Sequence, residues 1–334
     1  MGTKLHEALA IDLEAVDAAL RDVVDSDADL PADSPVREHV LRLIHAGGKR
    51  LRPIMVLVGG RFGSKPSGPY VMRTATVMEY LHTASLIHDD IIDRSALRRG
   101  VPTLHNVTDV HTAVYIANYM MARAVEWAAG ASERQPTEED ETDENVCYCT
   151  ELVSIIPELC LGEYVQLRDR FNFDMTMEDY MRKTRSKTAL LMAHCLKAGA
   201  KAAAADEGVA QLLFDYGEAL GMAFQIRDDV LDFTESESVI GKPPGSDLRN
   251  GNVTLPVLYA LEDQAIAAFI RSLGEDDTDD RFRMAVRMIR DSGAPGRALE
   301  KANRYVESAQ AILHRLADMP ASRDLQVLGS YFTR

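Results

Sequence analysis

The chain has 334 residues, of which 46% are hydrophobic and 27% are charged, so it is long enough to bury a large core. Its 37 lysines and arginines face 52 aspartates and glutamates, which gives a formal net charge of −15 at pH 7. A balance this acidic argues against non-specific nucleic-acid binding and against an electrostatic membrane anchor, because both need a basic surface.

The N-terminus and the cysteines favour a cytoplasmic protein. The first twenty residues are acidic where a signal peptide would have a basic patch followed by an apolar run. No uninterrupted apolar stretch reaches the length of a membrane-spanning helix. The cysteines lack the C-x-x-C pairing of zinc sites, so we expect buried small hydrophobic residues in a reducing compartment. They are Cys147, Cys149, Cys160 and Cys195.

Helical periodicity runs through almost the whole chain, and strand signals are nearly absent. Asp33-Ser34-Pro35 is a helix-start signal, and Gly47-Gly48 ends the helix that follows it. The segment GGKRLRPIMVLVGGRF then restarts a buried helix. The other helices predicted before the final third of the chain cover residues 3–25, 70–93, 110–130, 146–170, 177–199 and 207–234.

Two segments interrupt this pattern. Residues 132–145 (SERQPTEEDETDEN) read as an exposed and mobile acidic linker, and residues 240–252 form a loop rich in glycine and proline. The final third is helical by pattern and carries no chemical motif. The sequence therefore predicts an all-α fold, in which residues 1–334 form a single-domain bundle of ten or more helices around a central cavity.

The segment HTASLIHDDIIDRSALRRG, residues 82–100, places Asp89, Asp90 and Asp93 after an uncharged run. Positions i and i+4 share one face of a helix, so Asp89 and Asp93 project together with Asp90 beside them. Clustered carboxylates suit Mg²⁺, which takes oxygen ligands and completes its shell with water and substrate phosphate. For one such motif, a solvated helix end is an equally good explanation.

The segment FQIRDDVLDF repeats this spacing with Asp228, Asp229 and Asp232, again in an apolar helical setting. Two carboxylate triads on two helices can face each other across a cavity and hold several metal ions on one diphosphate. Solvated helix faces have no reason to repeat both the spacing and the setting. The pair therefore predicts a site for two or three Mg²⁺ ions.

Basic residues for an anionic ligand occur at loops and helix ends. Arginine binds phosphate oxygens through two N–H groups, and lysine acts as a point charge. Each residue taken alone is better explained as surface charge, but together they predict two diphosphate sites, one metal-bound and one held by lysine and arginine alone. They are Lys49, Arg50, Arg52, Arg98, Arg99, Lys187 and Lys242.

Five ordered motifs resemble those of the trans (E)-polyprenyl diphosphate synthases, from about residue 36 to the C-terminus. They are GGKRLRP, HDDIID followed by RRG, KTALL, FQIRDDVLDF, and GK followed by GSDL. The resemblance implies an all-α, usually homodimeric prenyltransferase that elongates an allylic diphosphate with isopentenyl diphosphate. It also implies Mg²⁺ as the cofactor.

The same resemblance implies roles for single residues. The Mg²⁺ ligands are Asp89, Asp90, Asp93, Asp228, Asp229 and Asp232, with Asp247 as an outer helper. The allylic diphosphate is held by Arg98, Lys187 and Lys242, and isopentenyl diphosphate by Lys49, Arg52, His82 and Arg99. Thr188 and Gln225 lie where the family stabilises the carbocation. A buried core histidine is the alternative for His82.

Product length is expected to depend on the floor beneath the first triad. One turn before Asp89 lie Ala84 and Ser85, where short-chain members tend to have bulky aromatics, so a medium or long product is expected. The segments ELCLGEYVQLRDRFNF and DLRNGNVTLPVLYAL look like the large subunit of bacterial heptaprenyl diphosphate synthase. That family needs a small second protein for full activity, so the expected partner is a second copy or such a subunit.

Two positions depart from the common family pattern. Asn252 stands where many relatives have a lysine in GKxTLP, and Asn118 replaces an aspartate commonly found in GDYL. The first change removes a charge that would face phosphate, and the second removes a carboxylate.

Three rival functions remain: a synthase of shorter product (geranylgeranyl or farnesyl diphosphate), a terpene cyclase of the same fold, and a non-catalytic regulatory subunit. A cyclase should lack the GGKRLRP motif and carry an Asn/Ser/Glu metal motif in place of DDVLD. Regulatory subunits usually lose one triad, whereas both triads are intact here.

Overall fold

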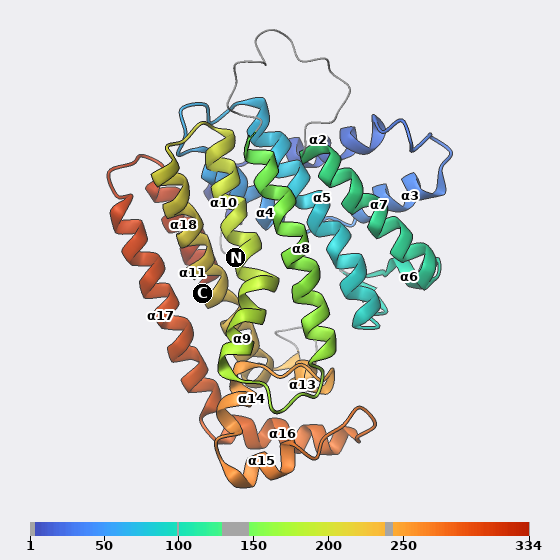
Figure 1. Cartoon of the computed structure of the whole chain (residues 1–334), viewed down its shortest axis with the longest axis vertical. Helices are drawn as coiled ribbons and strands as arrows, with labels where there is room; N and C mark the ends of the chain where they lie inside the picture. The colour runs from blue at the N-terminus through green and yellow to red at the C-terminus, as the bar shows by residue number, and fades with distance from the viewer. Residues whose placement is uncertain (1–3, 99, 129–146, 238–242, 334) are drawn as a thin grey trace. The chain divides into compact units, whose positions relative to one another are not determined.

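The computed structural model describes residues 4–98, 100–128, 147–237 and 243–333. Nearly all regular structure in these ranges is helical, which confirms the all-α prediction (Figure 1). The predicted acidic linker at 132–145, together with Arg99 and Lys242, lies outside the described residues.

In the first part of the chain, the elements are α1 (Leu5–Ala8), α2 (Leu13–Asp25), α3 (Pro35–His45), α4 (Leu51–Gly60), α5 (Pro69–Ile92), β1 (Leu97–Arg98), β2 (Val101–Pro102), α6 (Leu104–Val107) and α7 (Val110–Ala128). They continue with α8 (Cys147–Arg168), α9 (Met177–Thr184), the π-helical turn η2 (Arg185–Ala189), α10 (Leu190–Ala202), α11 (Glu207–Thr234), α13 (Ser246–Arg249), α14 (Leu255–Ala260), α15 (Gln264–Ile270), α16 (Asp279–Asp291), α17 (Ala294–Arg315) and α18 (Ser322–Phe332).

The chain divides into two compact units, each assembled from segments that are far apart in sequence. Unit 1 comprises Met1–Ile156, His194–Phe214 and Leu316–Leu328. Unit 2 comprises Pro157–Ala193, Asp215–Arg315 and Gly329–Arg334. Whether the chain acts as the single domain expected from the sequence stays a prediction.

Helix α5 is the centre of unit 1 and packs against α2, α4 and α7 (Figure 1). It is buried on most faces, as its apolar sequence predicts, and its fully buried side chains include Ala75, Met78, Tyr80 and Ala84. Its N-terminus has proline in the first turn. Proline is compatible with this position because the N–H groups of the first turn have no acceptor within the helix.

Two glycines let α4 approach the part of α10 that belongs to unit 1. A Cβ atom on Gly199 would lie 1.9 Å from the Val56 carbonyl oxygen, and one on Gly59 would lie 2.1 Å from the Leu196 carbonyl oxygen. Only glycine allows backbones this close. The contact fixes α4, and with it the GGKRLRP segment at its N-terminus.

Unit 2 has its own hydrophobic core. Phe173 and Tyr180 lie in it together with Phe233 of α11, and side chains of α14, α16 and α17 complete it. Helix α9 begins with a capping box, in which Thr176 and Asp179 each accept a hydrogen bond from the other's backbone N–H. The π-helical turn η2 follows α9 directly and carries Lys187 and Thr188.

Two of three local predictions were wrong. The helix expected at 3–25 is two helices, because Ala10 has a φ of 49° and the Asp12 side chain caps a new helix by accepting from the N–H groups of Glu14 and Ala15. The helix expected at 177–199 is confirmed, because α9, η2 and α10 follow one another without a gap. Cys195 is buried as expected, whereas Cys160 is exposed.

Across the described ranges, no helix combines the length and the apolar character needed to cross a membrane.

The close contact between α4 and α10 leads to a stability prediction. Gly199→Ala forces the two backbones apart and should destabilise the fold by about 1–3 kcal/mol or more. Gly296→Ala is the matched control, because nothing lies within 4 Å of a Cβ atom at this position in α17. Urea unfolding of both variants measures the difference, and equal stability would contradict the tight contact.

Candidate active site

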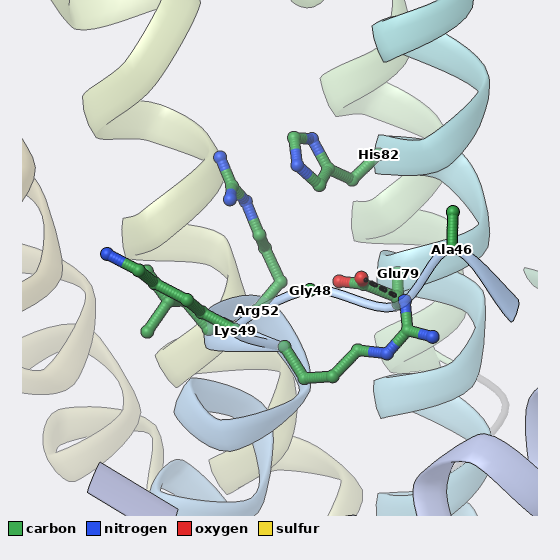
Figure 2. Close-up of a pocket in the computed structure, with 8 residues that line it drawn as sticks. Ala46, Gly48, Lys49, Arg52, Glu79 and His82 are labelled. Atoms are coloured by element: carbon green, nitrogen blue, oxygen red, sulfur yellow. Dashed lines mark hydrogen bonds and ion pairs between the residues drawn. The ribbon is translucent and has the colours of Figure 1, made fainter. Parts of the chain in front are cut away.

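A pocket of about 470 Å³ lies at the N-terminus of α4 in unit 1 (Figure 2). Lys49, Arg52 and His82, three of the four residues assigned from the sequence to the isopentenyl diphosphate site, line it together. The rest of the lining is Ala46, Gly48, Arg50, Leu51 and Glu79. The structure thus gathers three cationic or hydrogen-bonding groups that lie up to 33 residues apart in sequence.

The loop that forms the pocket depends on left-handed backbone conformations. Gly47 and Gly48 have φ values of 69° and 153°, and Arg50 has a φ of 49°. Glycine adopts such values without strain, which explains the Gly-Gly pair, whereas a non-glycine residue in this region carries a cost of about 1–3 kcal/mol. Arg50 is therefore held there by its surroundings.

The polar atoms facing this pocket suit an anion. In the described part of the chain, Arg52 Nε is buried and has no hydrogen-bond partner. Burial lowers the pKa of the Arg52 guanidinium, and the charges of Glu79 and Asp89 oppose this shift. Figure 2 shows Arg52 extending towards His82 on the inner side of the pocket. A phosphate group placed here would satisfy the buried N–H.

The first aspartate triad lies at the C-terminal end of α5, in the same unit. Asp89 and Asp90 are in the helix, and Asp93 is its C-cap, with its N–H bonded to the Asp89 carbonyl. Asp90 is buried and forms a 2.6 Å ion pair with Arg98. Burial raises the pKa of Asp90, and the bond from Arg98 opposes the shift. The proposed allylic-site arginine therefore contacts a proposed metal ligand.

The second triad lies in α11 of unit 2, with Asp228 exposed and both Asp229 and Asp232 buried. Asp229 accepts hydrogen bonds from the Tyr180 hydroxyl (2.6 Å) and from Gln225 Nε2 (2.9 Å). Burial, followed by the nearby charge of Asp247, raises the pKa of Asp229 to about 7. Asp229 is thus a buried carboxylate whose charge its neighbours only partly offset.

The loop that precedes α13 brings Asp247 to this triad. The Asp247 N–H donates to Asp232 Oδ2 at 3.2 Å, and the Gly245 N–H donates to the Asp232 carbonyl at 2.7 Å. Asp247 thus contacts the triad through its backbone N–H, and its outer-helper role stays a prediction.

Thr188 and Gln225 are connected to the second triad by hydrogen bonds. The Thr188 hydroxyl donates to Gln225 Oε1 at 2.8 Å, and the Gln225 amide in turn donates to Asp229. Lys187 donates to Gln166 at 3.0 Å. Single π-helical turns within helices often occur at functional sites, and η2 presents Lys187 and Thr188 from consecutive positions.

Each triad supplies carboxylate oxygens, the ligand type that a hard divalent cation prefers. Among the described residues, no group of three or more His, Cys, Asp or Glu side chains is arranged to hold a metal ion by itself. Mg²⁺ is usually bound by one or two carboxylates and completes its shell with water and phosphate. Asp90 in unit 1 and Asp229 in unit 2 each offer buried carboxylate oxygens, the ligand type that Mg²⁺ prefers.

Sequence analysis missed several buried partners of these residues. Lys183 donates to the Val253 carbonyl at 3.1 Å, and burial lowers its pKa while the charge of Asp229 opposes the shift. Tyr180, Lys183 and Glu79 stand in no recognisable motif. Their roles follow from burial next to charged groups, which a single sequence does not reveal.

An all-helical chain with an arginine–lysine pocket and two aspartate triads defines a class of enzymes that act on diphosphate esters. Comparison with known proteins specifies the family. Residues 34–289 match the polyprenyl synthetase family, and the chain belongs to it. It is a trans-prenyltransferase.

Individual relatives agree with this assignment. The chain is 38% identical over 316 residues to heptaprenyl diphosphate synthase component 2 of Geobacillus stearothermophilus, covering 95% of this chain and 92% of that protein. The crystal structure of heptaprenyl diphosphate synthase from Staphylococcus aureus matches with a TM-score of 0.84 and 31% identity, over 96% of this chain and 97% of the other. A Caulobacter crescentus polyprenyl synthase complexed with calcium and isoprenyl diphosphate matches with a TM-score of 0.83 and 30% identity, over 99% and 97%.

The raised pKa of Asp229 predicts a pH-dependent stabilisation by metal. The folded protein holds a proton on Asp229 that the unfolded chain releases above about pH 4, so stability falls as pH rises towards 7 and the whole penalty is present above it. Mg²⁺ should therefore raise Tm more at pH 8 than at pH 5. Asp229→Asn should reduce both the pH dependence and the Mg²⁺ effect.

Thermal unfolding followed by circular dichroism measures both effects. Asp280→Asn is the matched control, because the Asp280 side chain is 89% exposed and pairs only with Arg283 three residues on among the contacts described. A Tm that responds to Mg²⁺ equally in wild type and Asp229→Asn would exclude Asp229 as a metal ligand.

Proposed function

We propose that this prenyltransferase is Mg²⁺-dependent and condenses isopentenyl diphosphate with an allylic diphosphate to make an all-trans, heptaprenyl-like polyprenyl diphosphate. The observation that carries the proposal is the pocket formed by Lys49, Arg52 and His82 in unit 1. It offers an anion site made of basic groups, distinct from the aspartate triads. The heptaprenyl synthase relatives support the product class.

Isopentenyl diphosphate is expected to bind in this pocket through its diphosphate. Arg52 would give its buried Nε–H to a phosphate oxygen, and Lys49 would add positive charge. His82 lies seven residues before Asp89 on α5, about 10 Å along the helix axis. This separation leaves room for the five-carbon chain of isopentenyl diphosphate between the diphosphate in the pocket and the reacting centre near Asp89.

The allylic diphosphate is expected to bind at Arg98, Lys187 and Lys242. A divalent ion held by the two triads would supply the positive charge that a leaving diphosphate needs. Arg98 contacts Asp90 at 2.6 Å, so the arginine is already beside the proposed metal ligands. The departing diphosphate is the plausible base for the final proton loss from the product.

Thr188 and Gln225 are suited to stabilise positive charge on carbon. Because Thr188 donates its hydroxyl proton to Gln225, the lone pairs of Thr188 Oγ1 can face a developing carbocation. Gln225 is oriented by its own donation to Asp229. This chain of hydrogen bonds, from Thr188 to Gln225 to Asp229, determines which lone pairs remain available to the cation. Such fixed dipoles stabilise charge that develops in a transition state.

Product length is proposed to depend on Ala84 and Ser85. The Ala84 side chain is fully buried in α5, and the Ser85 hydroxyl donates to the His82 carbonyl at 2.9 Å. Both side chains are small, and we propose that a longer chain extends past them below the first triad. A synthase of shorter product is the alternative, and product analysis separates the two.

A second subunit is also proposed. One relative is named as component 2 of its synthase, which supports a partner for this chain as well. Tyr115 on α7 is 73% exposed and Val110 is 47% exposed, so α7 offers apolar surface to a second copy or to a small subunit.

The elongation activity is tested by incubating the purified protein with Mg²⁺, farnesyl diphosphate and labelled isopentenyl diphosphate, followed by chromatography of the dephosphorylated products. We expect products of medium or long chain, and no turnover when EDTA removes the metal. Failure to elongate, even after a small partner subunit is supplied, would reject the proposal and favour a non-catalytic subunit.

The cavity floor is tested by Ala84→Phe, which should shorten the main product by one or more isoprene units because the ring fills space below Asp89. Ala265→Phe is the control, since Ala265 is exposed on α15, away from any proposed site. Chromatography of the products compares both variants with wild type. An unchanged product in a folded Ala84→Phe enzyme would refute this placement of the floor.

A further inference from the structure

Arg50 connects three helices of unit 1 beneath the pocket. Its Nε donates to Asp17 Oδ1 of α2 at 2.8 Å, and its Nη1 donates to Glu79 Oε1 of α5 at 2.9 Å. Its Nη2 donates to the Ile44 carbonyl near the end of α3 at 2.7 Å. All three nitrogens are engaged with different segments, so the guanidinium is a fixed part of the scaffold.

These bonds hold a conformation that the backbone alone disfavours. Arg50 is the N-cap of α4, with φ 49° and ψ 39°, in the left-handed region. The planar guanidinium satisfies three acceptors in one arrangement, which lysine cannot reproduce. Lys49, the preceding residue, and Arg52, two residues further on, are thereby fixed at the pocket.

Glu79 is the buried end of this ion pair and also lines the pocket. Its side chain and that of Arg50 are each 2% exposed, and the dashed line in Figure 2 marks their contact. Its second oxygen, Oε2, is buried and has no hydrogen-bond partner in the described part of the chain. The same carboxylate lies close enough to Arg52 to influence its charge.

A carboxylate in a pocket for an anion is unexpected, because it repels the ligand. Burial of Glu79 is tolerated only because Arg50 offsets its charge. Arg50 is also paired with Asp17, so it adds no free positive charge to the pocket, and the attraction for the ligand comes from Lys49 and Arg52. Arg50 therefore holds the loop, whereas Lys49 and Arg52 are placed to bind the ligand.

We propose that Arg50 and Glu79 are positioning residues for the diphosphate of isopentenyl diphosphate: they lock the loop so that Lys49 and Arg52 converge on it, and neither contacts it. The inference rests on the proposed assignment of this pocket. It predicts a selective loss, confined to the ligand of this pocket, when the ion pair is changed without loss of charge on Lys49 or Arg52.

Arg50→Lys and Glu79→Gln test this inference. Arg50→Lys keeps the positive charge but loses the three-way contact, and Glu79→Gln keeps an acceptor for Arg50 but loses the charge. Each should raise KM for isopentenyl diphosphate about tenfold or more, because small misplacements of binding groups have large effects. KM for farnesyl diphosphate should stay within about twofold of wild type.

Direct binding keeps the test independent of turnover. Calorimetric titration of isopentenyl diphosphate in EDTA reports on the pocket alone, since this site needs no metal. Wild type should bind, and Arg50→Lys should bind about tenfold more weakly. If wild type itself does not bind, the pocket assignment fails. If wild type binds and folded Arg50→Lys binds equally well, the positioning role alone is overturned.

Arg61→Lys is the matched control. Arg61 lies at the other end of α4, where it bonds Asp324 at 2.8 Å and the Leu9 carbonyl at 2.7 Å, away from the pocket. Arg61→Lys should change the stability of the protein without changing KM for isopentenyl diphosphate. Asp17→Ala removes the outer contact of Arg50 at a position where the Asp17 side chain is 35% exposed, and it is the second variant if Arg50→Lys unfolds. If the variants of Arg50, Glu79 and Asp17 raise KM equally for isopentenyl diphosphate and farnesyl diphosphate, the role is purely structural and the inference is overturned.

Discussion

Burial of charge along α5 is the constraint on which unit 1 depends. Glu79 and Asp90 are almost fully removed from water in the helix that forms the centre of the unit. An isolated buried carboxylate is strongly unfavourable, so each requires a cation from another segment. Arg50 supplies it to Glu79 and Arg98 supplies it to Asp90. The segments that carry these arginines also carry groups proposed to bind substrate. The need to compensate the buried carboxylates therefore also positions the proposed substrate-binding groups.

The second triad solves the same problem differently. Asp229 receives hydrogen bonds from Tyr180 and Gln225, and Lys183 is the nearby cation that offsets part of its charge. Neutral donors compensate a buried charge less completely than an ion pair does. Burial and the nearby charge of Asp247 therefore raise the pKa of Asp229 to about 7 in spite of these contacts. A divalent ion would relieve this burial cost, which connects metal binding to the stability of unit 2.

Backbone geometry brings these groups to their places. The close approach of α4 and α10 at Gly59 and Gly199 fixes the helix that begins at the pocket. The π-helical turn η2 advances the register of its helix, so Lys187 and Thr188 are presented without a break in the chain. In both cases a local departure from regular helix geometry or spacing places side chains where regular helices would not. The Arg50 backbone follows the same principle at the cost of local strain.

Sequence was sufficient for the helical class, for most helix limits, and for the two aspartate motifs. Helical periodicity and i, i+4 spacing are local properties, so Pro35 at the start of α3 and the triads at the end of α5 and within α11 could be predicted directly. Family-specific motifs extended this to Lys49, Arg52 and His82, which the fold gathers in one pocket.

Only the tertiary structure determined what surrounds these residues. Two triads with identical spacing differ in burial and in partners, because Asp90 meets an arginine whereas Asp229 meets a tyrosine, an amide and a lysine. Arg50 and Arg52 are two residues apart in one motif, yet the first is bonded into the scaffold and the second faces the pocket. The reason is physical: burial and charge compensation depend on contacts between distant segments, and residue type and spacing carry no record of those contacts.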